Sequence, residues 1–160
     1  MKVNDGFKFI TKECEITPEG GITIIINTKA TIRNQTGGIC MILGNSQLKS
    51  TGQKGGDCLA FGNATLKSTG QEDGYCWAQD NSTLESTGQK GGDCRAFGNA
   101  TLESTGQEGG ECWAFGNATL ESTGQKGGDC WAHGNATLRI NGQIGGNCGV
   151  YDNATLMEKK

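Results

Sequence analysis

The sequence contains a single histidine, His133, and a single proline, Pro18. It has no apolar run approaching the roughly twenty residues that cross a membrane, and its net charge of -3 leaves no surplus of lysine and arginine. The first residues are polar and mixed, so we expect neither a secretory signal nor a membrane span. No lysine or arginine stripe follows the chain, and we therefore expect no nucleic-acid partner.

An eighteen-residue unit recurs from Gly44 almost to the C-terminus and reads GNATLESTGQEGGECWAF where it begins at Gly98. A fixed period this short predicts a solenoid of stacked coils, whereas a repeat of two helices needs roughly thirty residues. We predict an all-β fold, a single-stranded parallel β-helix (β-solenoid) with 18-residue coils, over residues 40–160. Irregular N-terminal capping coils are expected over residues 1–39. Three positions keep the period without insertion: Cys40, Cys58, Cys76, Cys94, Cys112, Cys130 and Cys148; Asn45, Asn63, Asn81, Asn99, Asn117, Asn135 and Asn153; and Leu48, Leu66, Leu84, Leu102, Leu120, Leu138 and Leu156.

Alternation within the repeat assigns side chains to the interior or the surface. Leu102 should point inward together with Ala100 and Ser104, which turns Glu103 and its two threonine neighbours outward. Cys112 should face the interior from a second strand. We expect one Leu, with Ala, Ser, Cys and Gln around it, inside each coil.

Before the repeats, the sequence predicts a strand over residues 7–17, a turn over 18–21 and a second, buried strand over 22–26. Lys29-Ala-Thr-Ile-Arg33 imitates the Ala-Thr-Leu-Glu segment of the repeat. These features are the basis for expecting irregular coils at this end.

Stacked coils place equivalent residues about 4.8 Å apart. We expect the cysteines to be free, buried thiols, because parallel side chains rarely meet the torsional demand of a disulfide and a straight thiol column is poor geometry for zinc. The asparagines fit the glycosylation pattern but are too close for glycans. We therefore predict an asparagine ladder, and a cytoplasmic protein rather than one from a eukaryotic secretory pathway.

Charges alternate at the position after the recurrent glutamine: Lys54, Glu72, Lys90, Glu108 and Lys126. Each coil should then meet an opposite charge above and below. Exposed pairs contribute about 0.2 to 1 kcal/mol each, so we expect an effect on register, unless the alternation only reflects duplication of a two-coil unit.

Motifs for chemistry are missing. His133 stands where other repeats carry Phe, Gln or Tyr, which indicates a surface variant rather than a catalytic base. Hexapeptide acyltransferases have an aliphatic residue at every sixth position, one on each of the three sides of a coil. In this sequence the matching position of the third side carries Lys or Glu. Calcium-binding β-rolls need GGxGxD motifs, and the acidic column around Asp93 offers too few oxygens for calcium. We expect no enzyme, no catalytic residue, no metal site and no cofactor.

Two surfaces remain as candidates for function. The first, which we name the aromatic ridge, comprises Phe61, Trp77, Phe97, Trp113, Phe115, Trp131 and Tyr151, with Arg95 in the tryptophan column. The second is formed by two threonine columns, represented by Thr101 and Thr105, with glutamates between them. Aromatic residues are enriched in recognition surfaces, so the leading hypothesis is a structural or binding rod whose ridge contacts another protein or another copy in self-assembly. The alternative function is an ice-binding (antifreeze) protein that uses the threonine columns. For the ridge itself, the alternative without a function is that the rings only pack against one another within the fold.

The segment Ala96-Phe-Gly-Asn-Ala-Thr-Leu102 and its equivalent Val150-Tyr-Asp-Asn-Ala-Thr-Leu156 resemble the AYGNATV-like units of short-repeat β-solenoid proteins from bacteria and their phages. The similarity covers roughly Gly44 to Leu156. It implies a solenoid and a bacterial or phage setting, and no catalytic residues. The cysteine column and the Gly-Gly-Asp corner depart from the simplest members of that group.

Overall fold

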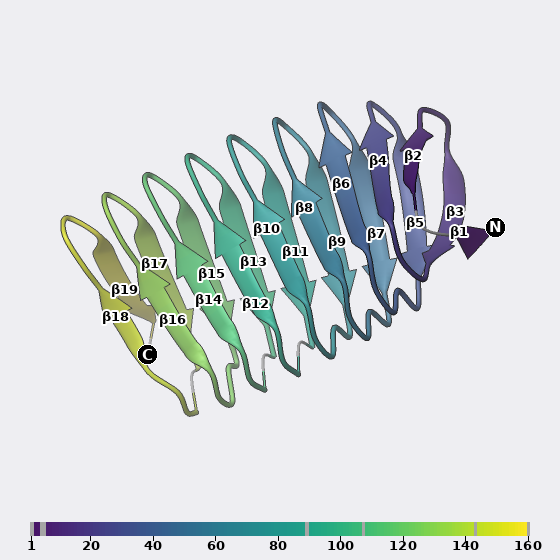
Figure 1. Cartoon of the computed structure of the whole chain (residues 1–160). Helices are drawn as coiled ribbons and strands as arrows, with labels where there is room; N and C mark the ends of the chain where they lie inside the picture. The colour runs from purple at the N-terminus through teal and green to yellow at the C-terminus, as the bar shows by residue number, and fades with distance from the viewer. Residues whose placement is uncertain (1, 4–5, 89, 107, 143, 160) are drawn as a thin grey trace.

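The structure is a computed structural model that describes residues 2–3, 6–88, 90–106, 108–142 and 144–159. Among these residues all regular structure is β, and the strands alternate along the chain between two parallel sheets (Figure 1). The β-solenoid predicted from the repeat is therefore confirmed, with two strands in each coil. In the described part of the chain there is no helix that could span a membrane.

One sheet has ten strands and the other nine. The ten-stranded sheet contains β1 (Lys2–Val3), β3 (Cys14–Pro18), β5 (Lys29–Arg33), β7 (Gln47–Thr51), β9 (Thr65–Thr69), β11 (Thr83–Thr87), β13 (Thr101–Thr105), β15 (Thr119–Thr123), β17 (Thr137–Asn141) and β19 (Thr155–Lys159). The nine-stranded sheet contains β2 (Phe7–Ile10), β4 (Ile22–Ile26), β6 (Ile39–Leu43), β8 (Asp57–Ala60), β10 (Tyr75–Ala78), β12 (Asp93–Ala96), β14 (Glu111–Ala114), β16 (Asp129–Ala132) and β18 (Cys148–Val150).

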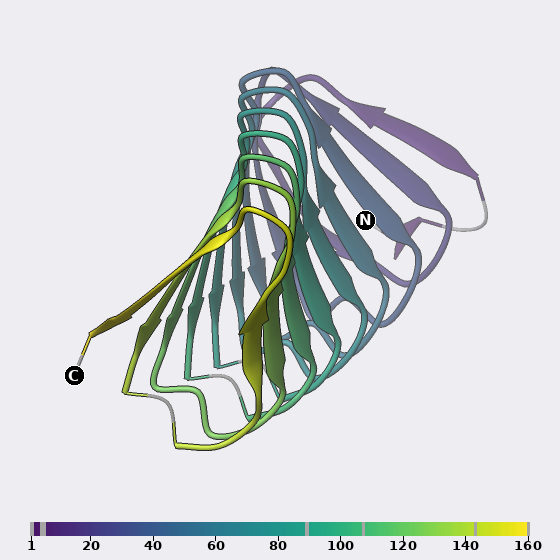
Figure 2. The ribbon, with the colours of Figure 1, turned by 90° about the vertical axis from the view of Figure 1, so that its left-hand side faces the viewer.

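Each coil is a wedge in cross-section. The two sheets meet at a narrow turn and diverge toward a wider one (Figure 2). The narrow turn follows the strands of the nine-stranded sheet and reads Phe-Gly-Asn after β8, β12 and β14. The wide turn carries the glycine-rich segment. Each repeat thus has two short strands, joined by one narrow and one wide turn, rather than three sides of equal length.

The first coils belong to the same stack but are shorter. Phe7 pairs with Ile22 and Ile22 pairs with Ile39, so neither step reaches the eighteen residues of the later coils. The strand predicted over residues 7–17 was wrong in one respect: it is two strands, β2 and β3, which lie in different sheets. The polar residues 11–13 between them form a corner because each side of a coil is only four or five residues long. Whether these coils act as a cap stays a prediction.

The interior is narrow and follows the predicted alternation. Leu102 and Ala100 are fully buried, Ser104 is nearly so, and Glu103 is exposed. Cys112 faces them from the other sheet and is also fully buried. Since a buried Leu contributes roughly 1.5 to 3 kcal/mol, the stability of the stack accumulates from coil to coil.

Glutamine side chains fill the interior beside the wide turn. Gln71 Nε2 donates a hydrogen bond to the Gly74 carbonyl at 2.8 Å, and its Oε1 accepts one from Cys76 Sγ at 2.9 Å. Gln125 bonds a backbone carbonyl in the same way and accepts from Cys130 Sγ at 2.8 Å. A buried amide without partners would be costly, so these bonds allow a large polar residue inside the coil.

Asparagine side chains form the predicted ladder at the narrow turn. Asn63 Nδ2 donates to Asn45 Oδ1 at 3.3 Å, and Asn99 Nδ2 donates to Asn81 Oδ1 at 3.2 Å. Bonds of the same kind continue as far as Asn135. Each amide therefore bonds its equivalent in the preceding coil.

The alternating charges at the wide turn form ion pairs between neighbouring coils. Lys90 Nζ lies 3.9 Å from Glu72 Oε1, and Lys126 Nζ lies 3.4 Å from Glu108 Oε1. All four side chains are at least half exposed. Each ion pair therefore contributes little to stability on its own. The pairs follow the alternation of positive and negative residues that the sequence predicts at this turn.

Neighbouring coils approach closely at the two consecutive glycines of the wide turn, and most closely at the second of them. Gly110 has φ +79°, and a Cβ atom there would overlap the carbonyl oxygen of Gly92 in the preceding coil. Gly106 has a similar φ of +65°, but a Cβ there would meet nothing within 4 Å. Comparing an alanine at Gly106 with an alanine at Gly110 therefore distinguishes the cost of a left-handed backbone from the cost of a clash between coils.

We predict that Gly106→Ala lowers the free energy of unfolding by about 1 to 2 kcal/mol, the cost of a left-handed alanine. Gly110→Ala should lower it by that amount and by roughly 1 to 3 kcal/mol more, because backbone atoms must move. Urea unfolding of both variants beside the wild type measures the difference. Equal losses in the two variants would contradict the packing of Gly110 against Gly92.

Candidate interaction surface

The aromatic ridge lies along the outward side of the nine-stranded sheet. Trp77, Trp113 and Trp131 are the third residues of β10, β14 and β16, where the alternation of burial turns them outward. The phenylalanine column lies at the start of the narrow turn, where Phe61, Phe97 and Phe115 follow directly after β8, β12 and β14. All of these rings are half-buried except Tyr151, which ends the ridge and is 49% exposed.

The rings stack face to face along the axis of the solenoid. Ring centroids are 4.4 Å apart for Trp77 and Phe97, with planes inclined by 20°, and 4.8 Å apart for Phe97 and Phe115, with planes inclined by 8°. Trp113 stacks on Phe115 of the same coil at 5.7 Å, whereas its ring is tilted by 39° from that of Trp131 in the next coil, at 6.1 Å. Most faces are thus used within the stack, and the ridge presents ring edges to its surroundings.

His133 belongs to this stack, which the sequence did not indicate. Its ring lies 5.3 Å from that of Phe115 and 4.6 Å from that of Tyr151, with planes inclined by 12° and 11°. Its Nε2 atom is buried and has no hydrogen-bond partner among the described residues. The eighteen-residue period could have placed it, since the positions before and after it in the column are aromatic.

Two polar side chains interrupt the ridge. Gln79 takes a phenylalanine position, and Trp77 covers the gap by stacking on Phe97. Arg95 takes a tryptophan position, where its guanidinium lies 3.2 Å from Asp93 Oδ2 and 5.5 Å from the centre of the Tyr75 ring. The stack of rings therefore runs without a break from Trp77 to Tyr151. Gln79 separates Phe61 from this stack, and Arg95 breaks the tryptophan column.

Carboxylates border the ridge on the side of the wide turn. Glu111 Oε2 accepts a hydrogen bond from Trp113 Nε1 at 2.8 Å. Asp93 Oδ1 accepts from the backbone N–H of Glu111 at 3.2 Å, and Asp129 Oδ1 accepts from that of Asn147 at 2.8 Å. These bonds use the carboxylates to join coils and to orient an indole.

No group of three or more His, Cys, Asp or Glu side chains in the described ranges is arranged to hold a metal ion. A groove of about 540 Å³ lies elsewhere, on the ten-stranded sheet between β3 and β9. Its lining mixes Glu13 and Glu15 with Lys29, Lys49 and Lys67. The opposite charges do not define a site for one class of ligand.

The cysteine column runs through the interior in register from Cys40 to Cys148. Each of these cysteines lies within the described residues, and none of them forms a disulfide. Burial raises the pKa of Cys40 to about 12 and holds the pKa of Cys58 well above its usual range. Thiolate is the reactive form of cysteine, so the interior thiols are chemically protected.

No family model matches the chain, and neither a curated protein nor a solved structure matches it. The resemblance to bacterial and phage repeat proteins therefore stays a prediction based on the repeat residues.

We predict that a thiol reagent at pH 8 modifies Cys14 and Cys148, which are only half-buried, and leaves the six buried thiols unmodified until the protein unfolds. Counting modified thiols by mass spectrometry, with and without denaturant, measures this. The Cys14→Ser and Cys148→Ser variants assign the two fast sites. Rapid modification of Cys94 in the native protein would contradict the buried column.

Proposed function

We propose that the protein is a non-catalytic rod that presents the aromatic ridge to a protein partner, in the first place another copy of itself. The proposal is supported by the continuous stack of half-buried rings along one sheet. A contiguous exposed apolar patch usually marks an interface, and Trp and Tyr are enriched among the residues that dominate binding energy.

The geometry favours a protein partner over a stacked small ligand. Phe97 and Phe115 each have ring neighbours along the axis, so a flat ligand could not insert between them without breaking the stack. The exposed ring edges and the indole of Trp113 suit packing against side chains of another protein. The ridge is also rigid, since a parallel sheet orders the backbone beneath it, and little conformational entropy is lost when it binds.

Ice binding by the threonine columns is the weaker candidate. The columns are in register, as Thr101 and Thr105 show by pairing with Thr119 and Thr123. A column of charged residues stands between them, however, and Lys67 and Glu85 within it form an ion pair of 2.7 Å. The threonine face is therefore not the uniform uncharged array that would favour ice binding.

We predict that Trp113→Ser weakens self-association at least about tenfold, the effect of losing a residue worth about 1.4 kcal/mol in an interface. Sedimentation velocity over a concentration series measures it, in about 1 M salt so that contacts between charges are screened. Met41→Ser is the matched control, because Met41 occupies the same column on β6 outside the ridge. A wild-type protein that stays monomeric at high concentration would contradict self-association through the ridge.

A further inference from the structure

The outward side of the ten-stranded sheet carries a single column of charges between the two threonine columns. We name it the central column, and its residues lie in register from strand to strand. Glu15 of β3 stands in the same column beyond the uncharged Thr31. From β7 onward the charged residues along the axis are Lys49, Lys67, Glu85, Glu103, Glu121 and Arg139. Two positive charges are thus followed by three negative charges and one positive charge.

Pairing within the chain leaves two of these charges unmatched. Lys67 Nζ lies 2.7 Å from Glu85 Oε2, and Arg139 Nη1 lies 3.9 Å from Glu121 Oε2. Lys49 pairs in register with Lys67, and Glu103 lies between Glu85 and Glu121. Neither Lys49 nor Glu103 has an ion pair among the described residues, and like charges on neighbouring strands are unfavourable.

We propose that two copies of the chain associate through this face as an antiparallel two-fold dimer. The two-fold axis would run along the strand direction, midway between β9 and β11. Lys49 of each copy then lies opposite Glu103 of the other, and Lys67 lies opposite Glu85. Such an interface is self-complementary, as a two-fold contact requires, and it supplies partners for the two charges that lack them within the chain.

The order of positive and negative charges along the central column favours this two-fold axis over other possible axes. A two-fold axis parallel to the solenoid would place every charge opposite its own copy. An antiparallel axis through β11 would also oppose unlike charges, but it would place Glu85 against its own copy. The axis between β9 and β11 matches two different pairs and opposes no like charges.

The area over which the charges match is small and indicates a weak dimer. A strand of five residues spans about 17 Å, and the four strands that carry the matched charges, β7 to β13, span roughly 19 Å, so the matched area is only about 320 Å² on each copy. Stable complexes bury about 800 Å² on each partner. The charges are also exposed, so the association should be lost in salt as the Debye length falls to about 3 Å at 1 M.

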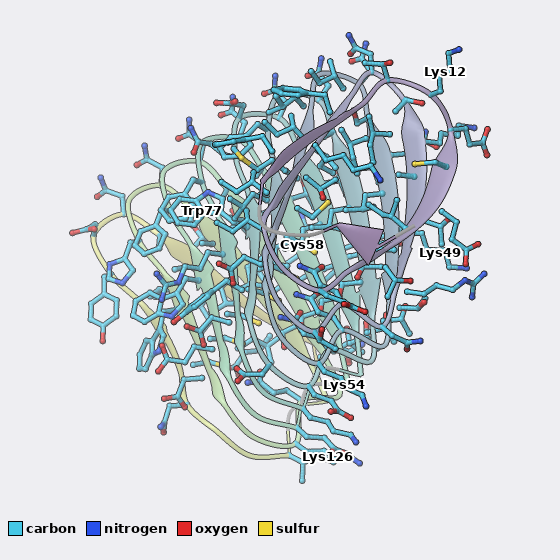
Figure 3. The ribbon with its side chains drawn as sticks, turned by 45° about the vertical axis from the view of Figure 1, so that its right-hand side comes forward. Lys12, Lys49, Lys54, Cys58, Trp77 and Lys126 are labelled. Atoms are coloured by element: carbon cyan, nitrogen blue, oxygen red, sulfur yellow. The ribbon has the colours of Figure 1, made fainter. Side chains whose placement is uncertain are left out.

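This face is distinct from the aromatic ridge. In Figure 3, Trp77 and Lys49 lie toward opposite sides of the stack, with Cys58 between them. Lys49 belongs to β7 of the ten-stranded sheet, whereas Trp77 belongs to β10 of the nine-stranded sheet. The inference therefore does not depend on the proposed function, and the two contacts respond differently to salt.

The test is a charge swap, carried out in the Trp113→Ser background so that contacts through the ridge are weakened. Sedimentation equilibrium at about 0.02 M salt, where screening is weak, should show a dimer. Lys49→Glu alone and Glu103→Lys alone should each weaken it at least about tenfold, because like charges then face each other. The double variant should dimerise like the parent.

Mixing provides the sharpest readout. Lys49→Glu and Glu103→Lys proteins should form a heterodimer with each other more tightly than either forms a homodimer, since both contacts then join unlike charges. Lys54→Glu is the matched control: it makes the same change of net charge at an exposed residue of the wide turn and should leave the dimer unchanged. A monomer at low salt, single variants that dimerise like the parent, or a mixture that gains nothing would each overturn the proposal.

Discussion

The structure depends on one constraint, the stacking of each coil on its equivalent at the spacing of strands in a parallel sheet. Every side chain therefore lies beside the same position of the coils before and after it, as the pairing of Leu102 with Leu84 and Leu120 shows. Residue types that gain from contact with their own kind satisfy this constraint directly. Leucines pack, asparagine amides bond one another, and aromatic rings stack. The constraint also explains why Gly110 cannot carry a side chain, because the backbone of the preceding coil occupies that space.

Charged residues are unfavourable under this constraint when residues of the same sign lie side by side in neighbouring coils, and the chain arranges its charges in two different ways. At the wide turn the signs alternate, and Lys126 pairs with Glu108 in the coil before it. On the ten-stranded sheet the signs occur in blocks, so that Lys67 and Glu85 pair where two blocks meet while Glu103 remains among like charges. The first arrangement satisfies its charges within one chain, and the second leaves charges that a partner could match. The aromatic ridge differs from both, since it gains from stacking within the chain and still exposes apolar edges.

The period of the sequence was enough to predict the class of fold, the register and the faces of the repeat strands, because a fixed period and alternation depend only on the backbone. The cross-section was not predictable, since two or three sides can be cut from the same eighteen residues. The strand predicted over residues 7–17 failed because a polar corner at residues 11–13 has no glycine or proline to mark it. His133 was predicted to be a surface variant because of the column it occupies, and it lies half-buried in the outer ring column, but its stacking between Phe115 and Tyr151 was not anticipated. The direction of ring faces could not be read from sequence at all, because it depends on side-chain rotamers.

Distances along one column test the stacking of coils most directly. The background for this test is a chain in which Cys14 and Cys148 are replaced by serine. Two variants then carry pairs of spin labels on introduced cysteines, one at Thr51 and Thr105 and the other at Thr51 and Thr123. The two pairs span three and four strand spacings of the same sheet. Electron paramagnetic resonance should give backbone separations of about 14 and 19 Å, because each coil adds about 4.8 Å. Equal separations for the two pairs, or separations that do not grow with the number of coils, would contradict the in-register stack.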